Sequence, residues 1–194
     1  MSNSINKAKL LFLLTGVAIM GIIFALMPSK PLTETEYRQE AEKVSQRQEW
    51  QALEILAKEW QKQLPTSEMS HAALGDSYRM RGNYPDAAEA YSNAIKIAPG
   101  NSQIWAYHGI MMLEVSHFEQ AAASCQSSLF IDSNHTQAWY CIALAKAELS
   151  QSEAALEALS RLSALDPGLH ETARKIIRNH VCKKPGSKLP ASLC

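Results

Sequence analysis

The sequence predicts an all-α chain, in which one apolar N-terminal helix precedes a stack of paired helices that ends in a single further helix. Two observations predict the helices: an uncharged apolar run near the start, and prolines that recur at a spacing of about 34 residues along the rest of the chain. The terminal helix is predicted by apolar residues that recur at helical spacing over residues 170–181.

The apolar run covers residues 10–27 and follows a short tail, residues 1–9. As a helix it would measure about 27 Å, close to the ~30 Å hydrocarbon core of a bilayer. Pro28 and Pro31 end it, so residues 28–33 form a linker. Because the run exceeds the usual apolar length of a signal peptide and no small-x-small cleavage site follows, we expect an uncleaved signal anchor rather than a cleaved signal.

The flanking charges bear on orientation. Lys7 and Lys9 on the short N-terminal tail favour a cytoplasmic N-terminus. For a single-pass protein of a bacterial inner membrane, this orientation places the rest of the chain in the periplasm. Lys30, Arg38 and Lys43 lie on the other flank, so a cytoplasmic domain stays open as the alternative.

The proline spacing divides the chain into repeats. One interval separates Pro65 from Pro99, and Pro167 lies two such intervals beyond Pro99. The missing member would stand at Ser133, between Asp132 and Asn134, which are themselves turn-forming residues. The repeats are therefore four units, residues 34–67, 68–101, 102–135 and 136–169.

The second unit resembles the tetratricopeptide repeat (TPR) family, through Leu74, Gly75, Tyr78, Ala87, Tyr91, Ala94 and Pro99. The third and fourth units share the pattern, and the first, residues 34–67, is degenerate. The resemblance covers residues 34–169. It implies a right-handed superhelix of antiparallel helix pairs, a TPR solenoid, in which small residues allow the close approach of helices. Residues 170–181 would then be the capping helix that a repeat array needs at its end.

Composition and motifs argue against several functions. The stretch 31–173 carries 19 acids and 10 bases, so it has no basic face for nucleic acid. The six histidines show no metal-ligand spacing, and no phosphate loop or nucleophile motif is present. We therefore expect no enzyme activity, no catalytic residue, no metal and no cofactor.

The four cysteines are of two kinds. Cys125 falls at position 24 of its unit, a buried packing site, where we expect a small apolar side chain, and Cys141 lies near the inner face of a first helix. Cys182 and Cys194 flank a basic, turn-rich tail, residues 182–194. A disulfide between these two would require an oxidising compartment, and two unpaired thiols are the alternative.

The resemblance also implies a binding surface, because the first helices of TPR units line a concave groove that holds peptides or helices. Family positions place twelve residues in it: Met69, Asp76, Arg79, Met80, Gln103, Tyr107, Ile110, Glu114, Gln137, Tyr140, Leu144 and Glu148. Family members that clamp a peptide carboxylate use lysines and asparagines that are absent here. An aromatic and aliphatic lining with acids along its rim suits an apolar or amphipathic protein segment that carries some positive charge.

Together these features predict a non-catalytic, membrane-anchored TPR scaffold or adaptor that binds protein partners and assists assembly of an envelope complex. The layout is similar to that of TPR accessory proteins of cytochrome c maturation, which recruit apocytochrome, and this is the first alternative. A thiol-dependent redox factor that uses Cys182 and Cys194 is the second, and self-association through the repeats is the third.

Overall fold

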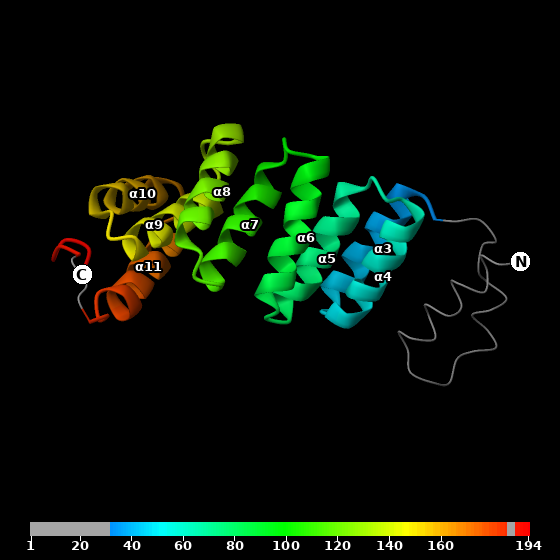
Figure 1. Ribbon diagram of the computed structural model, residues 1–194, viewed down its shortest axis with the longest axis horizontal. Helices are drawn as coiled ribbons and strands as arrows, with labels where there is room; N and C mark the ends of the chain where they lie inside the picture. Colours follow the sequence, from blue (N-terminus) through cyan, green and yellow to red (C-terminus); the bar gives the residue numbers. More distant parts are fainter. Residues whose placement is uncertain (1–31, 186–188) are drawn as a thin grey trace, which may run out of the picture. The chain divides into compact units, whose positions relative to one another are not determined.

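The computed structural model describes residues 32–185 and 189–194, and it is all-α over this part of the chain (Figure 1). Within the repeats, α3 (Glu34–Gln46) packs against α4 (Trp50–Gln63), α7 (Ser102–Glu114) against α8 (Phe118–Ile131), and α9 (Thr136–Glu148) against α10 (Ser152–Leu165). Helix α5 (Glu68–Met80) packs on α4, and α6 (Tyr84–Ile97) packs on α7. Then follow α11 (Pro167–Ile176) and the short π-helix η1 (Ile177–Val181). The all-α helical solenoid predicted from the repeats is confirmed.

No helix in residues 32–185 and 189–194 is long and apolar enough to cross a bilayer. The predicted transmembrane helix at residues 10–27, its preceding tail and most of the linker lie outside the described residues. The anchor therefore stays a prediction.

The helix boundaries keep the register of the repeats through all four units. The first helices begin at Glu34, Glu68, Ser102 and Thr136, one repeat length apart in each case. The second helices begin at Trp50, Tyr84, Phe118 and Ser152, with the same spacing. The first repeat, although degenerate in sequence, is thus a complete helix pair. In the third repeat, Ser133 occupies the position at which the other repeats have a proline.

Contacts along the chain divide the molecule into two compact units, which are larger than the repeats and are called the first and second unit from here on. The first unit ends at Gly82 and the second begins at Asn83. In the first, α3, α4 and α5 enclose a core that includes Leu53 and Leu56. Tyr37 stacks on Trp60 with ring centroids 5.4 Å apart and planes 7° apart. Glu34 accepts hydrogen bonds from Trp60 Nε1 at 3.0 Å and from the Ser67 hydroxyl at 2.7 Å. One carboxylate thereby joins the starts of α3 and α5 to the end of α4.

The second unit, α6 to η1, is packed through small residues. Gly109 and Ala121 are buried where α7 meets α8, and Ala143 and Ala155 are buried in α9 and α10. A methyl group on Gly109 would lie 2.2 Å from Cys125 Sγ, so only glycine fits there. This close approach is the role expected of the small residues of the repeat.

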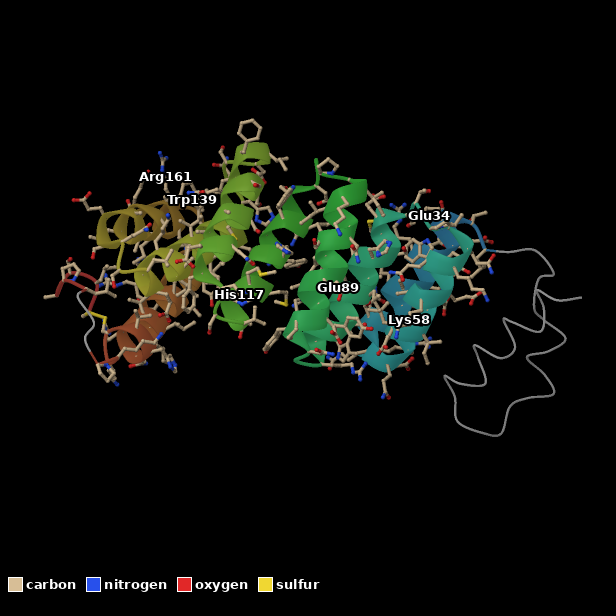
Figure 2. The ribbon with its side chains drawn as sticks, viewed as in Figure 1. Glu34, Lys58, Glu89, His117, Trp139 and Arg161 are labelled. Carbon is tan, nitrogen blue, oxygen red and sulfur yellow. A yellow bond between two sulfur atoms is a disulfide. The ribbon has the colours of Figure 1, made fainter. Side chains whose placement is uncertain are left out.

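In this unit, tryptophan side chains form hydrogen bonds to the backbone of the segments that connect successive repeats. Trp105 Nε1 donates to the Pro99 carbonyl at 2.7 Å, and Trp139, labelled in Figure 2, donates to the Ser133 carbonyl at 2.8 Å. Pro99 and Ser133 are equivalent in the register. Since the contact uses a backbone carbonyl, serine serves as well as proline.

The turn inside each helix pair places one residue in the left-handed region. Gly82 has φ +75°, and Gln48, Ser116 and Ser150 have φ between 58° and 62° at the equivalent positions of the other units. Glycine adopts this conformation without a steric penalty, whereas the other three side chains are strained by it.

The predicted cap begins earlier than residue 170. Asp166 accepts the Leu169 N–H through its side chain and caps α11, with Pro167 in the first turn. Pro167 therefore lies in the first turn of α11, in addition to marking the end of the fourth repeat. Ala173 of α11 and Ile177 of η1 are buried, and α11 packs against α9 and α10.

Candidate partner-binding surfaces

The groove residues predicted in the third and fourth repeats belong to the second compact unit, which begins at Asn83. They lie on α7 and α9, which pack side by side. Gln103 Nε2 donates to Gln137 Oε1 at 2.9 Å, and the two residues occupy the same position of successive repeats. Equivalent groove positions of the third and fourth repeats are therefore adjacent in space.

The two tyrosines of this set are half-buried. The Tyr107 ring lies 5.7 Å from the ring of Tyr91 in α6, at a tilt of 39°. Burial raises the pKa of Tyr140, and the nearby charge of Glu114 raises it further. The acid of α7 thus acts electrostatically on the tyrosine hydroxyl of α9.

The aliphatic members of the set differ in exposure. Ile110 is half-buried and packs on the core of the second unit. Leu144 is only 9% exposed and belongs to that core, so it offers little surface to a partner.

Glu148 already has a partner within the chain. Its carboxylate accepts a hydrogen bond from Lys184 Nζ, and the same ammonium lies 5.7 Å from the centre of the Phe118 ring. Of the acids predicted along the rim of the groove, this one is neutralised by the chain's own basic tail.

The groove residues predicted on α5 belong to the first unit. Met69 packs partly buried on its core, and Met80 is 45% exposed. Asp76 and Arg79 form an ion pair at 3.1 Å within the helix. Their charges therefore offset each other one helical turn apart.

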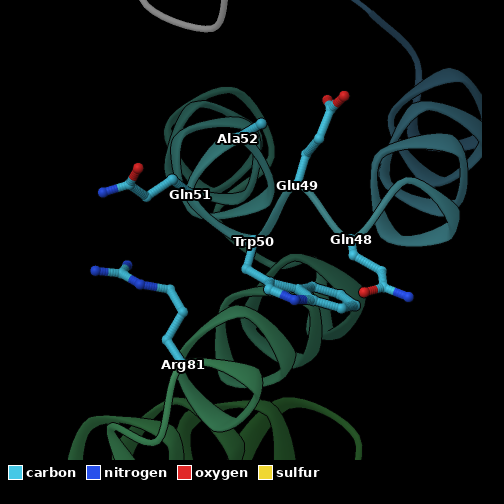
Figure 3. Close-up of a pocket in the computed structure, with 6 residues that line it drawn as sticks. All are labelled: Gln48, Glu49, Trp50, Gln51, Ala52 and Arg81. Carbon is cyan, nitrogen blue, oxygen red and sulfur yellow. The ribbon is translucent and has the colours of Figure 1, made fainter.

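A pocket that the sequence did not indicate lies in the first unit, with a volume of about 430 Å³. It is lined by Gln48, Glu49, Trp50, Gln51, Ala52 and Arg81 (Figure 3). In Figure 3 the Gln51 amide and the Arg81 guanidinium point the same way, whereas the Trp50 indole points to the opposite side. The lining joins the start of α4 to the end of α5, two segments that are well separated in the sequence and that no motif links.

Charges next to this pocket are tightly paired. Glu54 accepts hydrogen bonds from Lys58 at 2.6 Å and from Arg81. Partial burial alone would raise the pKa of Glu54, but the bonds and charges of Lys58 and Arg81 outweigh it and lower the pKa. The Lys58 ammonium also lies 5.8 Å from the centre of the Tyr78 ring. The cluster ties α4 to α5 and keeps Arg81 at the pocket wall.

Two disulfides join all four cysteines of the chain. The tail bridge, Cys182–Cys194, has an S–S distance of 2.16 Å and begins directly after η1. The core bridge, Cys125–Cys141, has an S–S distance of 2.09 Å and joins α8 to α9. The expectation that Cys125 is an unpaired apolar side chain is wrong, because its repeat position faces the position of Cys141 in the next unit.

The described residues hold no group of three or more His, Cys, Asp or Glu side chains that could bind a metal ion. His108 Nδ1 lies 2.8 Å from Ser124 Oγ, and burial lowers the pKa of this histidine. The contact packs α7 on α8.

Comparison with known proteins shows which proteins this chain is similar to. Residues 69–101 match the tetratricopeptide repeat family. Sperm-associated antigen 1 of Rattus norvegicus is 30% identical over 94 residues, and the protein of the same name from Homo sapiens is 29% identical over 94 residues. The match covers 48% of this chain and 10% of each relative, so the chain spans about a tenth of their length.

Solved structures show the same fold. The TPR protein YrrB, described as having an unusual peptide-binding site, is 16% identical with a TM-score of 0.63, over 76% of this chain and 79% of that one. MamA is 16% identical with a TM-score of 0.62, over 71% and 90%. The TPR2B domain of yeast Sti1, solved in complex with an Hsp70 peptide, is 24% identical with a TM-score of 0.51, over 57% and 90%. The chain thus contains a segment that matches a tetratricopeptide repeat, and it has the fold of these TPR structures.

Proposed function

We propose that this protein is a membrane-anchored TPR adaptor, which holds an apolar or amphipathic segment of a partner protein on the first-helix face of its repeats and assists assembly of an envelope complex. The observation that carries the proposal is the Gln103–Gln137 hydrogen bond, since it sets equivalent groove positions of two repeats side by side. A segment lying across α7 and α9 would meet the same chemistry twice.

The composition of this face supports the choice of ligand. Tyr107 and Tyr140 are half-buried and offer aromatic surface, with the carboxylate of Glu114 near Tyr140. Aromatic side chains lose little conformational entropy on binding, and an adjacent acid selects segments that carry a positive charge. TPR structures such as the Sti1 complex hold peptides, which supports a peptide segment as the ligand class.

The state of the cysteines supports the oxidising side of the membrane. All four are paired, and two disulfides in one small domain are typical of periplasmic or extracellular proteins. Together with the cytoplasmic N-terminus favoured by Lys7 and Lys9, this supports a periplasmic location for the repeats.

Site-specific photocrosslinking of the full chain in its own membranes tests the proposed face. A photoreactive residue at Gln103, which is exposed on α7, should capture a partner polypeptide. The matched control is a photoreactive residue at Glu157, which is exposed on α10. The double variant Tyr107→Ala/Tyr140→Ala should abolish the adduct at position 103 and leave helix content unchanged.

An equal yield of adducts from positions 103 and 157, or an adduct that survives the double variant, would refute this face as the binding site. Mass spectrometry of the adduct identifies the partner. An apocytochrome segment in the adduct would support the narrower form of the proposal, a role in cytochrome c maturation.

A further inference from the structure

The two bridges differ in how far a reagent can reach them. Cys125 and Cys141 are both 0% exposed, and the core bridge is covered by Gly109, whose Cα leaves no room for even a methyl group. Cys194 is exposed and Cys182 is half-buried. Thiol–disulfide exchange requires a thiolate to approach one of the sulfur atoms directly. In the folded protein only the tail bridge satisfies this requirement.

The charges around the tail bridge favour exchange. From residue 174 to the C-terminus the sequence carries six bases and no acid. Arg178 Nε donates to a main-chain oxygen of Cys194 at 3.1 Å and so offsets the negative charge of the terminal carboxylate, and Lys183 follows Cys182 directly and is exposed. Positive charge stabilises a departing thiolate and attracts an anionic attacking one. The acidic side chain that forms an ion pair with the described part of the tail is Glu148, and Lys184 neutralises it.

We propose that Cys182–Cys194 is a thiol-exchange site for anionic thiols, and that it reacts while the repeats stay folded. The incoming thiolate attacks Cys194 Sγ and forms a mixed disulfide with it. The Cys182–Cys194 bond breaks and its electron pair leaves on Cys182 as a thiolate, next to Lys183. A second thiolate of the same class can then attack the mixed disulfide, which releases Cys194 as a thiolate and a disulfide of the two reagent molecules.

The contacts of the tail explain why the repeats stay folded during this reaction. Leu193 is 1% exposed and belongs to the core of the second unit, and Arg174 donates to the Ser192 carbonyl at 3.3 Å. These contacts hold the tail independently of the bridge. The tail bridge is thus a surface site for covalent attachment of a thiol, whereas the core bridge is a buried structural disulfide.

Reduced glutathione, which carries net negative charge, and cysteamine, which carries positive charge, are the two probes. The full chain in detergent is treated with each at neutral pH, blocked with N-ethylmaleimide and mapped by mass spectrometry. Glutathione should add to Cys194 at least tenfold faster than cysteamine, after normalisation to an unstructured disulfide peptide. The Cys125–Cys141 peptide should remain bridged, and in guanidinium both bridges should react.

Two charge variants sharpen the test. Arg178→Gln/Lys183→Gln should slow glutathione several-fold and leave cysteamine unchanged or faster, whereas Arg161→Gln, on the exposed face of α10, should change neither rate. The proposal is overturned if both bridges react together under native conditions, if neither reacts, or if the two probes react equally fast.

Discussion

The contact between the second helix of one repeat and the first helix of the next is made in two different ways in the second unit. Between α6 and α7, the rings of Tyr91 and Tyr107 meet at 5.7 Å. Between α8 and α9, Cys125 and Cys141 are joined covalently. Both pairs have the same sequence separation and stand at positions 24 and 6 of consecutive repeats. The repeat fold thus fixes which positions meet, and the residue type decides how they interact.

The aromatic pair and the disulfide stabilise the protein in different ways, because the first acts on the folded state and the second mainly on the unfolded state. An aromatic pair stabilises the folded state by about 0.5–1.5 kcal/mol beyond the area it buries. A bridge that closes a loop of about 15 residues contributes about 3 kcal/mol, mainly by restricting the unfolded chain. The covalent contact is therefore expected to be the stronger of the two.

Replacing Gly109 should cause the largest loss of unfolding free energy, because this glycine packs directly against the core bridge. In Gly109→Ala the new methyl would lie 2.2 Å from Cys125 Sγ and 3.0 Å from the Ala121 carbonyl oxygen, so α7 must move away from α8. We expect a loss of about 3–5 kcal/mol in unfolding free energy, measured by urea denaturation without reductant. Gly100→Ala is the control, since its methyl would meet no atom within 4 Å. Similar effects of the two substitutions would contradict the close packing at the bridge.

Removing the bridge itself should have the next largest effect. Cys125→Ala/Cys141→Ala should lower the unfolding free energy by about 3 kcal/mol, because the unfolded chain regains the freedom of the loop. Tyr107→Leu, which removes the aromatic pairing at the equivalent position, should cost about 1 kcal/mol. A bridge variant that loses less than the tyrosine variant would reverse the comparison.

The same comparison shows where sequence reasoning stops. The register of the repeats, the helix pairs and the buried small residues can all be predicted, because each follows from a local pattern that recurs. The core bridge escapes prediction as long as Cys125 and Cys141 are considered one repeat at a time. A signal for it exists, since Tyr91 and Tyr107 occupy the same two positions one repeat earlier. The pocket at Trp50 and Arg81, and the pairing of Glu148 with Lys184, depend on side-chain geometry between distant segments, and no periodicity reveals them.

Turn substitutions should show whether the two repeats joined by the core bridge are equally strained at their turns. Ser116→Gly and Ser150→Gly each place glycine at a left-handed residue, with φ 62° and 58°. Each should raise the unfolding free energy by about 0.5–1 kcal/mol, measured by thermal denaturation. Gly82→Ala, at the equivalent turn with φ +75°, should lower it by a similar amount. A gain at only one serine would show that neighbouring packing, rather than backbone strain, dominates that turn.

Acid should weaken the bridged side of the comparison through His108. This residue precedes Gly109, and its Nδ1 lies 2.8 Å from the hydroxyl of Ser124, which precedes Cys125. Burial lowers the pKa of His108 in the folded protein, whereas the unfolded chain keeps the usual value of about 6.5. The unfolded state therefore binds more protons, so the stabilisation by neutral His108 is complete above about pH 6.5 and is lost as the pH falls towards the folded pKa. Urea denaturation at pH 7.5 and 5.5 measures the loss.

His108→Gln keeps a neutral side chain that can hydrogen-bond to Ser124, so it should reduce the difference between the two pH values. His135, whose pKa burial also lowers despite the opposing charge of Asp132, should account for part of the remainder. His117→Gln, an exposed position at the start of α8, is the control and should leave the difference unchanged. If His108→Gln and His117→Gln behaved alike, the acid sensitivity would not arise at the α7–α8 contact, and the bridged repeats would be no more pH-dependent than the tyrosine-paired ones.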